Sequence, residues 1–161
     1  MQKDIIELAQ RLGQVLQAKN WLAATAESCT GGGVAYAITA ISGSSAWFDR
    51  SFVTYTNEAK QQMLGVAAST LEKYGAVSEA VVREMTAGTL AHSQANIAVA
   101  ISGIAGPTGG SEEKPVGTVW IAWQICEGEA HTERYLFSGD REQVRLQAIR
   151  EALSGLLSFS E

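Results

Sequence analysis

The sequence predicts an α/β protein: a single three-layer α/β/α domain over residues 1–161, built on a mixed sheet that includes an antiparallel hairpin. Segments with helical apolar spacing alternate with short apolar segments, which is typical of a sheet covered by helices on both faces. Two strand-like segments near the C-terminus are separated by little more than Glu127-Gly128-Glu129, as in a hairpin. A chain of 161 residues corresponds to about one domain.

The N-terminal part of the chain supplies two helices and two strands. Apolar residues recur at helical spacing over 4–19, which predicts an amphipathic helix. The short apolar run 21–26 predicts a buried strand, and 34–41 is expected to return as a helix. Residues 50–56 are rich in aromatic and β-branched side chains and predict a second strand.

Two helices are expected in the middle of the chain. Asn57 is a suitable N-cap and Gly65 a suitable stop for a short helix over 57–64. Ser78 is a suitable N-cap for a longer helix that reaches about Ser93.

The C-terminal part predicts three strands and a helix. Residues 97–101 are continuously apolar, as in a buried strand. The runs 116–126 and 132–137 predict the hairpin, and Asp140 is a suitable N-cap for a last helix to about Ser158.

Composition and charge exclude several classes of protein. With 12 basic and 17 acidic residues, a formal net charge of -5 argues against a broad nucleic-acid interface. No apolar run approaches the roughly 20 residues of a membrane span, and the N-terminus lacks the order of a signal peptide. Cys29 and Cys126 cannot form a disulfide framework, and no Cys/His cluster has zinc spacing. We therefore expect a cytoplasmic protein with no metal, no membrane or nucleic-acid partner, and a homo-oligomeric state, with a dimer as the working hypothesis.

Two glycine-rich loops follow predicted strands, at 27–33 and at 102–111. Ligands of open α/β sheets bind beyond the carboxyl ends of strands, and a glycine-rich turn presents backbone N–H groups to an anion. Either loop alone is also explained by turn geometry, whereas two at equivalent strand ends favour a ligand site. Neither matches a P-loop or a dinucleotide fingerprint.

Several residues in or near these loops, and both histidines, are alternative candidates for catalytic groups. Ser111 and Lys114 have the Ser-x-x-Lys spacing, but Pro115 disfavours the helix on which the two would meet. His92 and His131 lie away from both loops and are expected at the surface. Cys29 has no histidine placed to activate it and is expected to be a small buried residue. Lys60 follows a strand directly, and on base rate alone it would be a solvated helix lysine.

Six blocks of the sequence, in order along nearly the whole chain, resemble the CinA C-terminal domain family. They are Ala26–Gly32, Gly43–Phe48, Val53–Lys60, Gly75–Ser78, Ser102–Pro107 and Lys114–Val119. The resemblance implies an amidohydrolase that converts nicotinamide mononucleotide and water to nicotinate mononucleotide and ammonia, with no cofactor. It also implies a Ser/Lys dyad, which falls on Ser28 and Lys60. Thr108 departs from the family, where an acidic residue is common.

The residues around these motifs suggest further roles. Ser28 begins a strand-to-helix turn whose N–H groups, at Thr30, Gly31 and Gly32, are expected to face an oxyanion. Tyr55 is expected to hydrogen-bond one member of the dyad. Arg141 is a candidate bidentate ligand of the substrate phosphate.

The remaining binding residues are expected in the second loop and at the end of the first strand. Backbone N–H groups of the second loop are expected to bind the phosphate; the candidates are Ser102, Gly103, Gly106, Thr108 and Gly109. Glu27 is a candidate to balance the pyridinium charge. The alternative, from another class, is a non-catalytic nucleotide-sensing or interaction module linked to competence or DNA repair.

Overall fold

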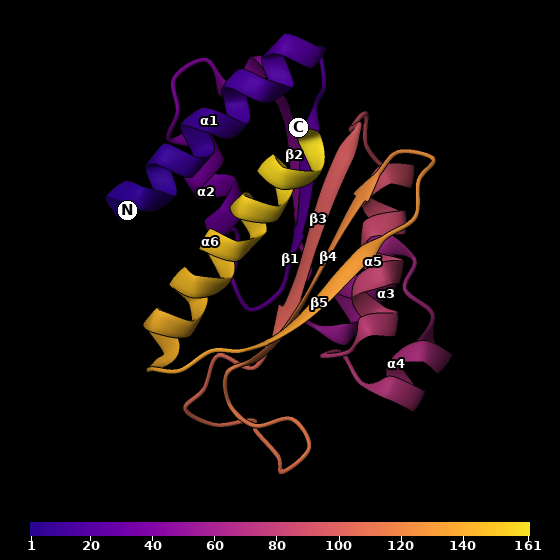
Figure 1. Ribbon diagram of the computed structural model, residues 1–161. Helices are drawn as coiled ribbons and strands as arrows, with labels where there is room; N and C mark the ends of the chain where they lie inside the picture. The colour runs from indigo at the N-terminus through magenta and orange to yellow at the C-terminus, as the bar shows by residue number, and fades with distance from the viewer.

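The computed structural model describes residues 1–161 as a five-stranded mixed sheet between two layers of helices (Figure 1). The strand order is β2-β1-β3-β4-β5; β2, β1 and β3 are parallel, whereas β4 and β5 are each antiparallel to the preceding strand. The strands are β1 (Ala23–Glu27), β2 (Phe48–Val53), β3 (Ile97–Gly103), β4 (Thr118–Ile125) and β5 (His131–Leu136). The α/β/α fold class and the antiparallel hairpin are confirmed.

Each face of the sheet carries three helices (Figure 1). One layer consists of α1 (Lys3–Lys19), α2 (Gly33–Thr39) and α6 (Arg141–Ser160); a short 3-10 turn, η1 (Ser44–Ala46), precedes β2. The other layer consists of α3 (Asn57–Leu64), α4 (Ala68–Tyr74) and α5 (Glu79–Ala91).

The two cores follow the alternation of side chains along the central strands. In β3, Ile97, Val99 and Ile101 belong to the larger core with α1, α2 and α6. Ala100 faces the other layer, where small strand residues let α5 lie close to the sheet. A Cβ added at Gly88 would lie 2.0 Å from a backbone oxygen of α3, so this glycine is required for the contact of α5 with α3.

Most of the predicted helix boundaries are confirmed. The side chains of Ser78 and Asp140 accept hydrogen bonds from backbone N–H groups three residues later, and Asp140 forms a complete capping box with Gln143. Gly65 ends α3 in the left-handed conformation at φ 72°. The N-cap of α3, however, is Thr56 rather than Asn57, so that expectation was wrong by one residue.

The structure differs from the sequence predictions at two other places. The second strand ends at Val53, because Thr54–Thr56 leave the sheet to begin α3. Helix α4 was not predicted, since Leu71 is its one buried apolar residue and no helical apolar pattern is visible in the sequence.

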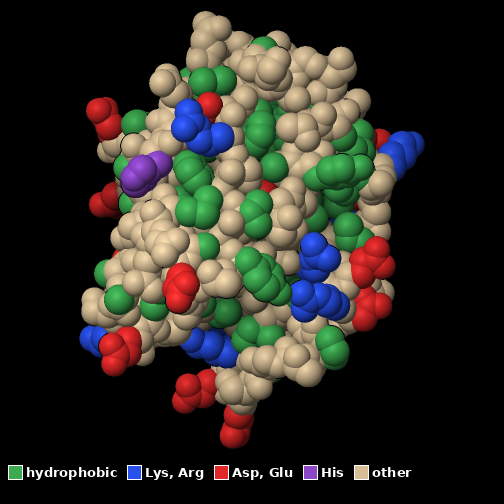
Figure 2. All heavy atoms as spheres, turned by 180° about the vertical axis from the view of Figure 1, so that it is seen from behind, with side chains coloured by type: hydrophobic (Ala, Val, Ile, Leu, Met, Phe, Trp, Pro, Cys, Tyr) green, Lys and Arg blue, Asp and Glu red, His purple; other side chains and the backbone are tan.

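Some features of the whole molecule bear on binding. No helix has the length and apolar character needed to cross a membrane. No cluster of three or more His, Cys, Asp or Glu side chains is arranged to hold a metal ion. On the face seen in Figure 2, hydrophobic side chains are interspersed with polar and charged ones.

Candidate active site

A pocket of about 350 Å³ lies beyond the carboxyl ends of β1 and β3, where both glycine-rich loops begin. This is the edge at which α/β proteins bind ligands. Its lining consists of Ser28, Cys29, Tyr55, Asn57, Lys60, Ala76, Val77, Ser102, Gly103, Ile104, Ala105, Gly106, Thr108, Gly109 and Arg141. Segments that are far apart in the sequence therefore meet in one site.

Ser28 and Lys60, which are 32 residues apart in sequence, are in contact in this pocket. Lys60 Nζ lies 3.1 Å from Ser28 Oγ, and the lysine is 1% exposed. The chain path explains the contact, because β2 pairs with β1 and α3 begins directly after β2. The first turn of α3 thus carries Lys60 back over the carboxyl end of β1.

The hydrogen-bond partners of Lys60 accommodate both protonation states. Lys60 Nζ donates to the backbone oxygens of Thr54 at 2.8 Å and Tyr55 at 3.3 Å. An ammonium group can donate its third proton to Ser28 Oγ. A neutral amine can satisfy the two backbone oxygens and offer its lone pair to the Ser28 hydroxyl proton. In the neutral form, the lone pair of Lys60 Nζ would thus face the Ser28 hydroxyl.

Burial also favours the neutral form of Lys60. Removal from water lowers the pKa of Lys60 from its ordinary value, because an ammonium ion is poorly solvated there. A thiolate at Cys29 would oppose this shift. Burial, assisted by the charge of Glu27, instead raises the pKa of Cys29 to about 12, so this thiol is protonated and uncharged at neutral pH.

Cys29 therefore has the environment of a structural residue. It is 5% exposed and belongs to the larger hydrophobic core. A reactive cysteine needs a lowered pKa, and that of Cys29 is raised. The expectation of a small buried cysteine is confirmed.

Arg141 connects the two sides of the pocket opening. Its guanidinium donates to the Gly106 backbone oxygen at 2.8 Å and to the Tyr55 hydroxyl at 3.3 Å. The Tyr55 side chain therefore binds Arg141, and only the Tyr55 backbone oxygen contacts the dyad, through Lys60. The expectation that the phenol would bind Ser28 or Lys60 is corrected.

The second glycine-rich loop offers several unused donors. The backbone N–H groups of Ala105, Gly106, Thr108, Gly109 and Gly110 donate to no acceptor within the protein. Gly106 and Gly109 have φ values of 85° and 95°, a conformation that side chains with a Cβ rarely adopt. The combination of free N–H groups with the nearby Arg141 guanidinium is suited to an anion.

The turn after Ser28 serves the fold rather than the pocket. Glu27 is fully buried, and its carboxylate accepts hydrogen bonds from the Thr30 hydroxyl and from the N–H groups of Val34 and Ala35 at the start of α2. The helix N-terminus is the ordinary place for such a charge. The expectation that Glu27 faces a pyridinium ring is therefore corrected.

The other predicted residues of this turn are also outside the pocket lining. Thr30 binds Glu27, while Gly31 and Gly32 supply φ values of 59° and 96° that reverse the chain into α2. These residues shape the turn that presents Ser28.

Arg145, which the sequence analysis did not single out, holds this turn from outside the pocket. Its guanidinium donates to the backbone oxygens of Cys29 at 3.0 Å and Thr30 at 3.4 Å. The Cys29 oxygen receives no other hydrogen bond. Since Arg141 and Arg145 are four residues apart on α6, they lie on one face of the helix and hold one loop each.

Five lining residues were also missed: Asn57, Ala76, Val77, Ile104 and Ala105. The Gly75–Ser78 block of the family resemblance carried a signal for Ala76 and Val77. Asn57 was interpreted only as a cap.

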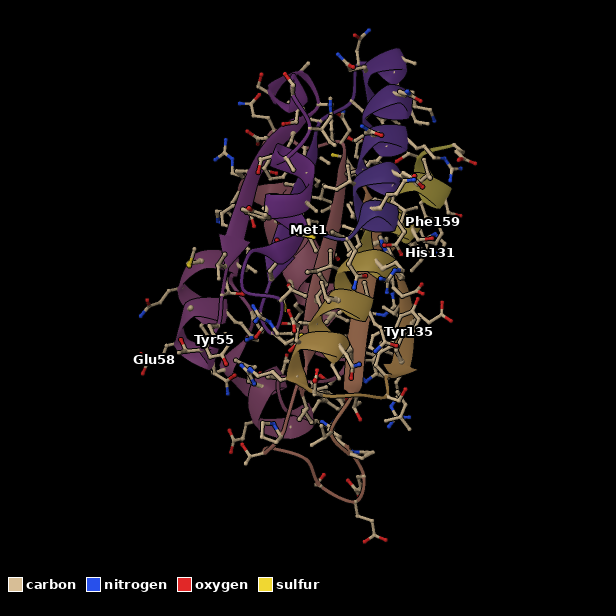
Figure 3. The ribbon with its side chains drawn as sticks, turned by 90° about the vertical axis from the view of Figure 1, so that its left-hand side faces the viewer. Met1, Tyr55, Glu58, His131, Tyr135 and Phe159 are labelled. Atoms are coloured by element: carbon tan, nitrogen blue, oxygen red, sulfur yellow. The ribbon has the colours of Figure 1, made fainter.

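The alternative catalytic groups are elsewhere. Lys114 Nζ donates to the Tyr74 backbone oxygen, so it does not meet Ser111 as a catalytic pair. His92 and His131 are exposed. In Figure 3, His131 lies on the opposite side of the molecule from Tyr55.

Comparison with known proteins identifies the family of this chain. The family model described as the CinA C-terminal domain matches residues 5–160. The chain belongs to the CinA C-terminal domain family. It is 58% identical over 153 residues to the nicotinamide-nucleotide amidohydrolase PncC of Escherichia coli. The aligned residues cover 95% of this chain and 93% of that protein. It is 53% identical to the PncC of Pseudomonas putida, with 96% of each chain covered.

CinA family members of known structure have the same fold. The crystal structure of the competence/damage inducible protein CihA from Agrobacterium tumefaciens matches with a TM-score of 0.98 and 46% identity, covering 100% of this chain and 98% of that one. The CinA domain also occurs within longer proteins. A CinA-like protein of Akkermansia muciniphila is 54% identical to 84% of this chain, and the aligned residues cover only 33% of that protein.

Proposed function

We propose that this protein is a nicotinamide-nucleotide amidohydrolase, which converts nicotinamide mononucleotide and water to nicotinate mononucleotide and ammonia. The observation that carries the proposal is the buried Lys60 amine 3.1 Å from Ser28 Oγ, in a pocket at the carboxyl edge of the sheet. The high identity to two proteins of that name, over nearly the whole length of each, supplies the substrate class.

In the first half of the reaction, neutral Lys60 takes the hydroxyl proton of Ser28 as Oγ attacks the carboxamide carbon. The carbonyl π bond opens to an oxyanion. When the carbonyl re-forms, the C–N bond breaks, and the nitrogen takes the proton from the Lys60 ammonium and leaves as ammonia. The product of this half is an ester of nicotinate mononucleotide with Ser28.

In the second half, neutral Lys60 takes a proton from a water molecule that attacks the ester carbon. The bond to Oγ then breaks, and the Lys60 proton returns to Ser28. Lys60 is thus neutral at the start of both halves, which is the form that its burial favours. The positive charge of the bound pyridinium would favour this form further.

The rest of the pocket is suited to the nucleotide part of this substrate. The phosphate dianion would be bound by the Arg141 guanidinium and by the free N–H groups of Ala105, Gly106, Thr108, Gly109 and Gly110. No acidic side chain belongs to the pocket lining, so repulsion from a nearby carboxylate would not oppose phosphate binding.

The direct test is ammonia release from nicotinamide mononucleotide by the purified protein and by Ser28→Ala. We expect the wild type to release ammonia and nicotinate mononucleotide in equal amounts, and Ser28→Ala to be inactive with an unchanged thermal unfolding curve. The sensing-module alternative predicts that the wild type binds the nucleotide and leaves it intact. A Ser28→Ala variant with full turnover would exclude the serine mechanism.

A further inference from the structure

Ser102 and Ser28 occupy equivalent positions on neighbouring parallel strands. Glu27 pairs with Ile101, and the Ser28 N–H donates to the Ile101 backbone oxygen, so Ser28 and Ser102 are the next residues of the two strands. Neighbouring strands lie roughly 4.8 Å apart. Because Ala26 and Ala100 both belong to the core beside α5, the alternation of side chains places Ser28 and Ser102 on this same face.

The Ser102 hydroxyl has no hydrogen-bond partner in the protein and is open to the pocket. The residue is 1% exposed, lines the pocket, and forms no side-chain hydrogen bond. Two other hydroxyls of the lining are engaged, that of Ser28 with Lys60 and that of Tyr55 with Arg141, and the remaining one, on Thr108, is exposed. The one fully enclosed side-chain atom without a hydrogen-bond partner is Thr54 Oγ1, so the unpartnered Ser102 hydroxyl reaches the pocket space, where a bound molecule can hydrogen-bond it.

A carboxamide bound beside Ser28 needs both donors and an acceptor. Its oxygen accepts hydrogen bonds, and its two N–H groups donate them. Three backbone oxygens around the dyad already accept hydrogen bonds, those of Thr54 and Tyr55 from Lys60 and that of Gly106 from Arg141. Ser102 Oγ is the buried side-chain acceptor of the lining that is left.

We propose that Ser102 is a further catalytic residue of the reaction, whose Oγ accepts a hydrogen bond from the carboxamide nitrogen and stabilises it as it leaves. This inference rests on the proposed function. As the nitrogen takes a proton from Lys60, positive charge develops on it, and its N–H donates a stronger hydrogen bond than in the bound substrate. An interaction that strengthens in this way lowers the barrier to the chemical step.

The experiment compares two substrates with Ser102→Ala: nicotinamide mononucleotide, and the methyl ester of nicotinate mononucleotide. The ester has the same carbonyl and phosphate but no N–H on its leaving group. We expect kcat/KM for the amide to fall about 10- to 100-fold, the effect of losing one hydrogen bond to a charged group. For the ester it should remain within about threefold of the wild type, since the ester never makes that bond.

Two controls accompany this comparison. Ser102→Ala removes no protein hydrogen bond, so the fold should persist; Ser102→Cys, of similar shape but with a weak acceptor, should show the same selective loss. Ser160→Ala removes a buried hydroxyl far along α6, which donates to the Leu156 backbone oxygen, and should leave both substrates unaffected.

The possible outcomes separate the two proposals. Equal losses for amide and ester, or no loss for either, would overturn the role of Ser102 while leaving the amidohydrolase intact. A wild-type protein that releases no ammonia from nicotinamide mononucleotide would overturn the amidohydrolase, and the role of Ser102 with it. A loss confined to the amide in both Ser102 variants would support the inference.

Discussion

Replacement of Lys60 by arginine separates the charge of this side chain from its basicity. Arginine keeps the positive charge but stays protonated at any working pH, so it cannot take the Ser28 proton. A general base typically contributes about 10²- to 10⁴-fold to turnover. We therefore expect kcat of Lys60→Arg to fall by about that factor, as measured by ammonia release.

The pH dependence of the wild type gives a second measure of the same group. An unperturbed lysine with a pKa of about 10.4 is neutral in only about four molecules per ten thousand at pH 7, and each unit by which the pKa falls raises that fraction about tenfold. Since burial lowers the pKa of Lys60, kcat/KM should rise with pH through an apparent pKa below 10.4. The same profile is expected for Cys29→Ser, because a thiol with a pKa of about 12 does not titrate in this range.

The same shift makes stability depend on pH. Because the pKa of Lys60 is lowered in the folded state, Lys60 binds fewer protons there than in the unfolded chain. The amount by which Lys60 destabilises the fold therefore shrinks as pH rises from the lowered pKa toward about 10.4. The free energy of unfolding of the wild type should therefore rise relative to Lys60→Met across that window. Two results would contradict the reasoning: substantial turnover by Lys60→Arg, or a stability difference that does not change with pH.

Three other substitutions test the surroundings of the dyad. Cys29→Ser should keep most of the turnover, since a protonated thiol is no nucleophile; an inactive Cys29→Ser with an active Ser28→Ala would reverse the assignment. Arg141→Gln should raise KM for nicotinamide mononucleotide at least tenfold. It should also lower the ratio of kcat/KM for the mononucleotide to kcat/KM for nicotinamide riboside, which lacks the phosphate. If this ratio did not change, Arg141 would not bind the phosphate. Arg145→Gln should lower kcat with little change in KM, because Arg145 holds the turn after Ser28 from outside the pocket. The control, Arg150→Gln, breaks the contact of α6 with Asp4 and should lower only the melting temperature. A raised KM in Arg145→Gln would place Arg145 in the binding site.

The order of the elements could be predicted because it depends on local patterns. The continuously apolar run of β3 and the turn at Glu127-Gly128-Glu129 are visible along the chain. Helices with strong caps, at Ser78 and Asp140, were placed within two residues at each end. Helix α4 was not, since its stability comes from Leu71 packing on a core that the rest of the chain provides.

The pairing of Ser28 with Lys60 could be predicted from the sequence only through the family resemblance. Separation along the chain does not specify distance, and a lysine at a helix start is ordinarily solvated. Its burial depends on β2 pairing beside β1, which brings the first turn of α3 over Ser28. The lowered pKa of Lys60 follows from that burial, so it too is a property of the tertiary structure.

The sequence by itself determined the fold class, the two glycine-rich loops and the residue types that amide hydrolysis needs. Only the tertiary structure decided which of these residues face the pocket. In the folded protein, Glu27 accepts hydrogen bonds from Thr30 and from the N-terminus of α2 and does not face the pocket. The Tyr55 hydroxyl binds Arg141, and the Ser102 hydroxyl has no partner in the protein. The physical reason is that local patterns are set by neighbours in the chain, whereas burial and hydrogen-bond partners are set by segments that meet only when the sheet forms.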